Sequence, residues 1–131
     1  ELGLEKMITF VGRVDQLRLP AYYKAADVFA LPSYHESFGL VTLESLACGT
    51  PVVATNVGGL SEFIRPGRTG YLIENNVPRA MARKISVLTS KNPNGIAPPE
   101  AIRASVAGYE WSSVAGAIVQ EYRSVLKGWP A

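Results

Sequence analysis

The segment VFALPSYHESFGLVTLESLACGTPVVA, residues 28–54, decides the fold. It opens with an apolar run at residues 28–31 and closes with another at residues 52–54. Neither run alternates apolar with polar residues, and both are rich in β-branched or aromatic side chains, which is typical of buried parallel strands. The residues between them therefore predict a crossover from one parallel strand, through a helix, to the next.

The crossover helix is expected to begin near Phe38, where the Ser37 side chain can cap it, and to run to about Cys48. Gly49 and Pro51 then end it. This helix starts at the carboxyl end of a strand, where free N–H groups and the positive end of the helix dipole favour an anion such as a diphosphate. That position gives the first indication of function.

Two carboxylates, Glu36 and Glu44, stand eight positions apart around the start of this helix. Eight helical residues would separate their backbones by about 12 Å, whereas the two acids of a glycosidase lie roughly 5–9.5 Å apart. This difference disfavours a hydrolase, and the reach of the side chains leaves that alternative open. By spacing alone, Glu44 is better explained as a solvated acid on a helix face, and Glu36 equally well as an exposed loop acid.

Five motifs follow one another along the chain: ADVFALPS at 26–33, an E-x7-E pair at 36–44, GTPVVA at 49–54, GG at 58–59 and GRTGYLI at 67–73. Their order resembles the donor-site signature of the retaining glycosyltransferases of family 4, nearest to the branch that makes sucrose phosphate or mycothiol precursors. The resemblance covers nearly the whole chain. It implies that residues 1–131 are a partial carboxyl-terminal, nucleotide-sugar-binding domain of a GT-B enzyme, with an α/β, Rossmann-like parallel sheet and helices on both faces, truncated at its N-terminal side.

The resemblance also implies site residues. Glu36 would be the catalytic-site acid that contacts hydroxyls of the transferred sugar, and Glu44 would accept hydrogen bonds from the ribose 2′- and 3′-hydroxyls of the donor. The main chain at Val14 would meet the nucleotide base. Backbone N–H groups would hold the diphosphate and sugar at Ser37, Phe38, Gly39 and Leu40. No cofactor or metal ion is expected, because the family neutralises the diphosphate with the helix dipole and basic side chains.

The remaining pattern predicts strands at residues 8–11 and 71–73, and helices at 19–26, 78–89, 99–107 and 111–127. In the family, two further strand–helix units lie in the sheet between the strands that match residues 8–11 and 28–31. This chain lacks both units. Because an unpaired, buried edge strand is unfavourable, we expect either that the first strand is displaced or that a second copy of the chain associates at the truncated sheet edge.

The last predicted helix carries an apolar stripe, and Ser112 or Ser113 is expected to start it. The stripe consists of Val114, Ile118, Tyr122 and Val125. The aromatic residues Tyr109, Trp111 and Tyr122 are expected in the core or in helix packing, and Cys48 as a small buried core residue. His35 is expected to be a plain loop residue, since no second histidine or neighbouring cysteine makes a metal site with it.

Composition excludes several classes of partner. The 131 residues carry a formal net charge of +2, which is too slight to argue for nucleic acid. Apolar content of 47% and charged content of 18% are ordinary for a globular domain, and no apolar run approaches the ~20 residues of a membrane span. A cytoplasmic location is consistent with the single cysteine. The chain begins with Glu, so we expect it to be a piece of something longer.

The sequence therefore predicts the donor-binding part of a retaining glycosyltransferase, with a nucleoside diphosphate sugar as its ligand. We expect the fragment alone to be inactive and to bind a nucleotide sugar weakly at best, because the Arg and Lys of the family's phosphate-binding loop and the acceptor-binding amino-terminal domain are missing from it. A dinucleotide-binding or response-regulator-like module is disfavoured, since no G-x-G-x-x-G follows the first predicted strand. A non-catalytic domain that serves a protein contact remains the alternative.

Overall fold

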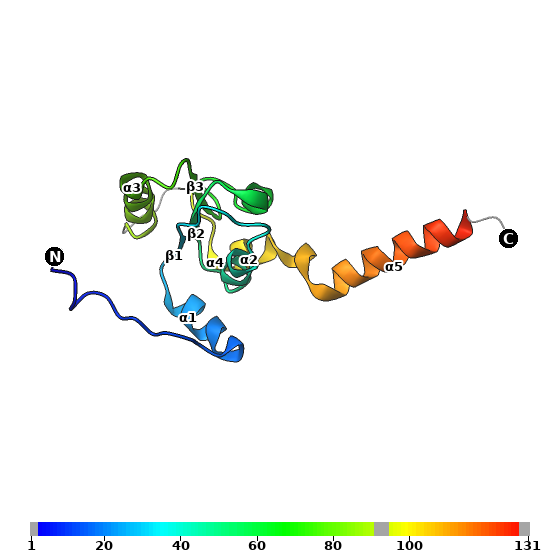
Figure 1. Ribbon diagram of the computed structural model, residues 1–131, viewed down its shortest axis with the longest axis horizontal. Coiled ribbons are helices and arrows are strands. Elements are labelled where there is room, and N and C mark those ends of the chain that lie inside the picture. Colours follow the sequence, from blue (N-terminus) through cyan, green and yellow to red (C-terminus); the bar gives the residue numbers. More distant parts are fainter. Residues whose placement is uncertain (1–2, 91–94, 129–131) are drawn as a thin grey trace.

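The computed structural model describes residues 3–90 and 95–128. Its sheet has three parallel strands, β1 (Phe29–Leu31), β2 (Val52–Thr55) and β3 (Gly70–Ile73), in the order β1-β2-β3. The two apolar runs pair in register, with Phe29 opposite Val52 and Leu31 opposite Ala54. Every residue of β2 is buried, because strands flank it on both sides and helices cover both faces. The expected α/β architecture is confirmed (Figure 1).

Helices connect and cover the strands. They are the 3₁₀ turns η1 (Gln16–Arg18), η2 (Gly58–Glu62) and η3 (Ala107–Tyr109), and the α-helices α1 (Leu19–Ala25), α2 (Leu40–Ala47), α3 (Pro78–Leu88), α4 (Pro99–Ala104) and α5 (Trp111–Lys127). The crossover predicted between β1 and β2 is α2, and the helices predicted at residues 19–26, 78–89 and 111–127 match α1, α3 and α5 to within one residue.

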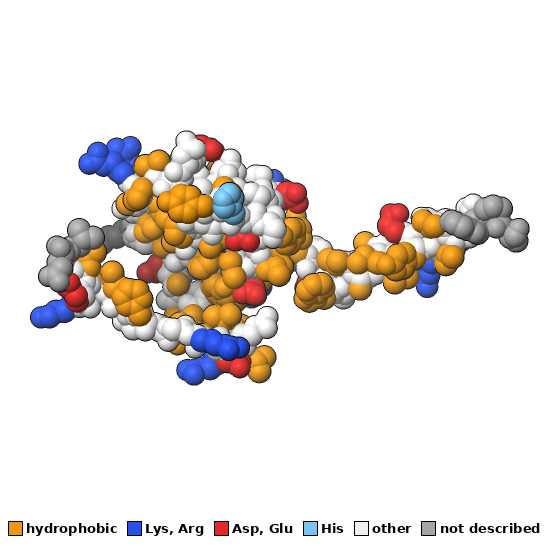
Figure 2. Space-filling view, viewed as in Figure 1, with side chains coloured by type: hydrophobic (Ala, Val, Ile, Leu, Met, Phe, Trp, Pro, Cys, Tyr) orange, Lys and Arg blue, Asp and Glu red, His pale blue; other side chains and the backbone are white. Residues whose placement is uncertain are grey.

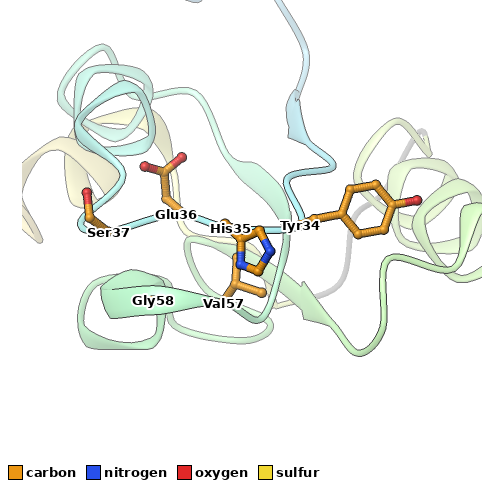
Figure 3. Close-up of a pocket in the computed structure, with 6 residues that line it drawn as sticks. All are labelled: Tyr34, His35, Glu36, Ser37, Val57 and Gly58. Atoms are coloured by element: carbon orange, nitrogen blue, oxygen red, sulfur yellow. The ribbon is translucent and has the colours of Figure 1, made fainter.

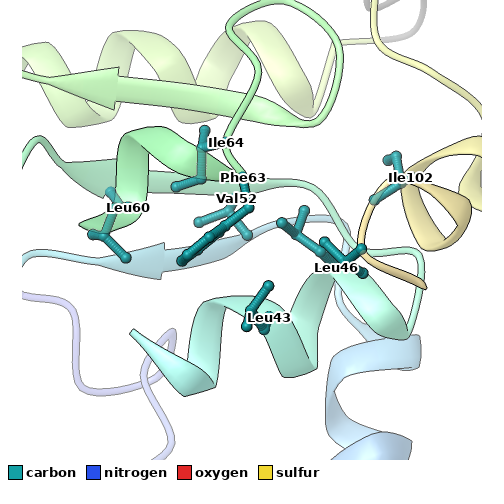
Figure 4. Close-up of a cluster of buried hydrophobic side chains, with 9 residues drawn as sticks. Leu43, Leu46, Val52, Leu60, Phe63, Ile64 and Ile102 are labelled. Atoms are coloured by element: carbon teal, nitrogen blue, oxygen red, sulfur yellow. The ribbon is translucent and has the colours of Figure 1, made fainter. Parts of the chain in front are cut away.

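Alternate residues of β2 face two separate cores. Val53 belongs to a cluster with Ile73, Met81 and Leu88 on the α3 side of the sheet. Val52 and Ala54 face the other side, where Leu43 and Leu46 of α2 pack with η2, Phe63 and Ile102 of α4 (Figure 4). A strand apolar on both faces is thus explained by helices on both faces.

The helix α2 begins later than expected. Its N-cap is Gly39, in the left-handed conformation with φ +83°, and no side chain caps it, so the prediction of a Ser37 cap was wrong. A side chain at Gly39 would collide with Leu60, which explains why a glycine stands here. The backbone of Ser37 instead accepts a hydrogen bond from the Gly59 N–H at 3.3 Å. At the other end Cys48 is half-buried rather than fully buried.

Residues 8–11 are not a strand, which corrects the prediction. They lie in an extended segment without regular structure, in which Ile8 is 48% and Phe10 is 92% exposed. Strand propensity alone does not form a strand, because the backbone needs a hydrogen-bonded neighbour. In the described ranges no strand lies beyond β1 to provide one. The first strand is therefore displaced from the sheet altogether.

The last helix, α5, projects away from the sheet and its helices (Figure 1). None of its residues is buried, and Trp111 is 81% exposed and Tyr122 67% exposed, so the expected core positions of these two aromatic residues were wrong. Hydrophobic side chains line the projecting helix (Figure 2). Its N-cap is Glu110, not Ser112 or Ser113. In the described ranges, 3–90 and 95–128, no helix combines the length and hydrophobicity needed to cross a bilayer.

Candidate functional site

A hollow of about 630 Å³ lies at the carboxyl ends of β1 and β2. Its lining comes from the loops that follow these two strands: Tyr34, His35, Glu36, Ser37, Val57 and Gly58 (Figure 3). The first loop is held where it leaves β1, because the Asn76 side chain donates a hydrogen bond to the Pro32 carbonyl at 2.7 Å. Ligands of parallel α/β sheets bind at this edge, outside the carboxyl ends of the strands.

The two loops are in direct backbone contact. Gly58 has φ +58°, and a Cβ atom there would collide with the carbonyl oxygen of Glu36. The neighbouring Gly59 N–H donates to the Ser37 carbonyl. The pair of glycines at 58–59 therefore lets the second loop lie directly against the backbone of Glu36 and Ser37.

The side chains of Glu36 and Ser37 point to the same side of their loop, away from Gly58 (Figure 3). Glu36 bends toward the start of α2, since its Cγ would lie 3.4 Å from a Cβ built on Gly39. The first N–H groups of a helix have no partner within the helix, and they carry the positive end of the dipole. Glu36 and these donors together can hold a ligand that has both hydroxyl groups and negative charge.

Glu44 lies on the next turn of α2 and lines a second hollow of about 460 Å³. Gln16 lies at one edge of this hollow, and Tyr109 and Trp111 at another. The carboxylate is not free to rotate, because the Tyr23 hydroxyl donates to Glu44 Oε2 at 3.1 Å. Burial, followed by the charge and hydrogen bond of Glu44, raises the pKa of Tyr23 from 10.0 to about 12.

The expected site residues divide between the two hollows. Glu36 and Ser37 line the first hollow, and Phe38, Leu40 and Glu44 line the second. Gly39 is buried between them at the start of α2. Val14 lines neither hollow, whereas Gln16, two residues later, lines the second. The structure thus groups these residues around the first two turns of one helix and leaves Val14 at the margin.

Aromatic packing fixes one wall of the second hollow. The Phe38 ring lies 5.7 Å from the Phe63 ring and 6.2 Å from the Tyr109 ring, measured between centroids. Phe63 and Tyr109 meet edge to face at 5.9 Å. This confirms the packing role expected for Tyr109. Within the part of the chain that the structure describes, no three His, Cys, Asp or Glu side chains gather as metal ligands would.

Stability at high pH is expected to depend on Tyr23. Because its pKa is about 12 in the folded chain and 10.0 is the ordinary value, its contribution to the free energy of unfolding is complete below pH 10 and is lost as the pH rises through 12. Urea unfolding across this range should show a shallower decline for Tyr23→Phe than for the unsubstituted chain. Equal slopes would show that another group causes the decline.

Comparison with known proteins relates this chain to a family of glycosyltransferases. The sequence profile described as "Glycosyl transferases group 1" matches residues 1–107. The D-inositol 3-phosphate glycosyltransferase of Corynebacterium urealyticum is 41% identical over 125 residues, which are 95% of this chain and 30% of that protein. The chain therefore spans less than a third of the length of this curated relative.

Two solved structures share the fold. Sucrose-phosphate synthase from Thermosynechococcus elongatus has a TM-score of 0.86 and 36% identity, over 96% of this chain and 32% of its own. The Anabaena protein Alr3699/HepE, in complex with UDP-glucose, has a TM-score of 0.74 and 27% identity, over 98% of this chain and 34% of its own.

Proposed function

From the premise that the chain belongs to the family of glycosyl transferases group 1, we propose that it forms the donor-binding part of a retaining glycosyltransferase. Such an enzyme moves a sugar from a nucleoside diphosphate to an acceptor hydroxyl. The observation that carries the proposal is the grouping of Glu36, the start of α2 and Glu44 at the carboxyl edge of the parallel sheet. The likeness to a protein solved in complex with UDP-glucose supports a nucleotide sugar as the ligand.

The sugar is assigned to the first hollow, and the diphosphate to the start of α2, between the two hollows. Glu36 accepts hydrogen bonds from sugar hydroxyls, because an ionised carboxylate has only acceptors to offer. The backbone N–H groups from Ser37 to Leu40 bind the diphosphate at the start of α2, where the helix dipole offsets its charge without a metal ion. The contact between Gly58 and the Glu36 carbonyl keeps this loop in place.

The nucleoside is assigned to the second hollow. Glu44 accepts hydrogen bonds from the ribose hydroxyls, and the main chain near Val14 and Gln16 meets the base. The hollow has the mixed character that a nucleoside needs, with aromatic walls at Phe38 and Tyr109 beside the carboxylates of Glu44 and Glu110. Acceptor binding and sugar transfer are assigned to a longer protein. The curated relative, of which this chain matches 30%, is an example of such a protein.

Calorimetric titration of the chain with UDP, GDP and ADP, each beside its glucose conjugate, tests the proposal. We expect saturable binding of one base, and Glu44→Ala should weaken it by roughly tenfold to a hundredfold, because hydrogen bonds to a charged acceptor are lost. Glu121→Ala is the matched control, since Glu121 is exposed on the projecting helix α5.

Two results would contradict the proposal. If no nucleotide binds at millimolar concentrations, either to this chain or to a longer protein that also carries the phosphate-binding loop, the donor-binding function is overturned, and the protein-contact alternative becomes the better explanation. If a nucleotide binds but Glu44→Ala and Glu121→Ala have equal effects, the nucleoside does not lie at Glu44.

A further inference from the structure

Tyr23 and Glu44 are 21 positions apart, on α1 and α2, and their side chains meet. The two helices pack against each other, and the Tyr23 hydroxyl reaches Glu44 Oε2 at 3.1 Å. Of the two groups, Glu44 borders a hollow and Tyr23 does not, since Tyr23 is only 8% exposed. The tyrosine therefore lies behind the carboxylate, on the side away from any ligand.

Two contacts other than the bond to Glu44 hold Tyr23 in place. Its backbone carbonyl accepts a hydrogen bond from Thr50 Oγ1 at 2.6 Å, and its ring meets the Phe29 ring edge to face at 5.4 Å. The Thr50 carbonyl accepts in turn from Ser45 Oγ at 3.1 Å. Because Ser45 follows Glu44 on α2, the three hydrogen bonds connect α2 to Thr50, Thr50 to Tyr23, and Tyr23 back to Glu44 on α2. A donor fixed in this way defines where the carboxylate lies.

We infer that Tyr23 is a positioning residue for Glu44, which holds one carboxylate oxygen so that the remaining acceptor sites meet the ribose hydroxyls of a nucleotide. The inference rests on the proposed function of Glu44. A carboxylate has about four lone-pair sites, and one phenol proton occupies one of them, which leaves enough for two hydroxyl donors. Since the pKa of Tyr23 is raised to about 12, the phenol keeps its proton at neutral pH and stays a donor.

A purely structural role for Tyr23 makes a different prediction. If the bond only connects α1 to α2, its loss lowers the free energy of unfolding and weakens the binding of every nucleotide by the same factor. If the bond orients Glu44, its loss mainly affects ligands that use the ribose hydroxyls. The ratio of two dissociation constants, for UDP and for 2′-deoxy-UDP, separates these cases, because a general loss of folded structure cancels from the ratio.

The experiment compares the chain with Tyr23→Phe, which removes the hydroxyl and keeps the ring. We expect Tyr23→Phe to weaken the binding of UDP by roughly threefold to tenfold. The binding of 2′-deoxy-UDP should weaken less, so that the ratio of the two dissociation constants moves toward one. Tyr22→Phe is the matched control on the same helix, since Tyr22 is 43% exposed, and it should leave both constants unchanged. If Tyr23→Phe fails to fold, Thr50→Val, which removes the hydrogen bond to the Tyr23 backbone, should shift the ratio in the same direction.

The outcomes distinguish this inference from the function on which it rests. If the unsubstituted chain binds UDP and 2′-deoxy-UDP equally, or binds neither at millimolar concentrations, the ribose role of Glu44 fails and the inference fails with it. If the chain prefers UDP and Tyr23→Phe leaves that preference unchanged, the proposed function stands and the positioning role of Tyr23 is overturned.

Discussion

Gly58→Ala is expected to lower the free energy of unfolding by about 2–5 kcal/mol, from a left-handed backbone and an overpacked contact together. The φ angle of +58° already disfavours an alanine, and the added Cβ would collide with the Glu36 carbonyl oxygen. Relief requires the two loops to separate, and the loop that moves carries Glu36. Urea unfolding should therefore show the loss, and calorimetry should show weaker binding of a nucleotide sugar.

Gly67→Ala is the matched control for this prediction. Gly67 has φ +76°, and no atom of the described residues lies within 4 Å of a Cβ built there, so its substitution incurs the backbone strain without the collision. We expect a loss of about 1–2 kcal/mol and unchanged nucleotide binding. Equal losses for the two variants would mean that the contact between the loops contributes nothing beyond the strain of a single residue.

The sequence predicts the middle of the fold well because its signals there are strong and agree with one another. The run Val52–Thr55 is apolar on both faces, and helices do cover both faces. The segment before it has a strand, a helix start at a glycine-containing turn, and a glycine at the helix end, and each signal is local. Where propensity, pattern and turn chemistry agree, prediction succeeds.

Prediction fails where a residue depends on a distant partner. Ser37 has the side chain of a good cap, yet α2 is capped by Gly39 in a left-handed conformation, where Leu60 of η2 leaves no room for a side chain. Residues 8–11 have strand propensity, yet none of the strands within residues 3–90 and 95–128 lies where they would pair. The stripe on α5 correctly predicts a helix, but whether such a stripe is buried depends on what packs against it.

The same limit applies to the candidate site. Glu36 and Glu44 stand out from their motif, and the structure arranges both beside the start of α2. Tyr23 gave no signal, because an aromatic residue on an amphipathic helix is ordinary and its partner is 21 positions away. Gly58 belongs to one of the sequence motifs, and only the three-dimensional contact with residue 36 shows that it supports the site.

Leu46→Ala is expected to lower the free energy of unfolding by about 2–5 kcal/mol, through lost burial and the cavity left behind. Leu46 is fully buried, in the cluster where α2 meets the sheet and α4. Domains of this kind unfold at a cost of only about 5–15 kcal/mol. Because α2 also carries Glu44, the variant should stop binding nucleotide at a lower temperature than the unsubstituted chain, namely the temperature at which α2 unfolds from the sheet. Thermal and urea unfolding measure the loss.

Leu126→Ala makes the same chemical change at a position that is 73% exposed on α5. We expect it to change the free energy of unfolding by less than about 0.5 kcal/mol, as substitutions at exposed positions usually do. The contrast tests whether the folding energy lies in the layer between α2 and β2 rather than in hydrophobic residues generally. If both variants lost stability equally, the surface of α5 around Leu126 would be buried in solution, against some partner surface, and the projecting helix would contribute to the fold that supports the candidate site.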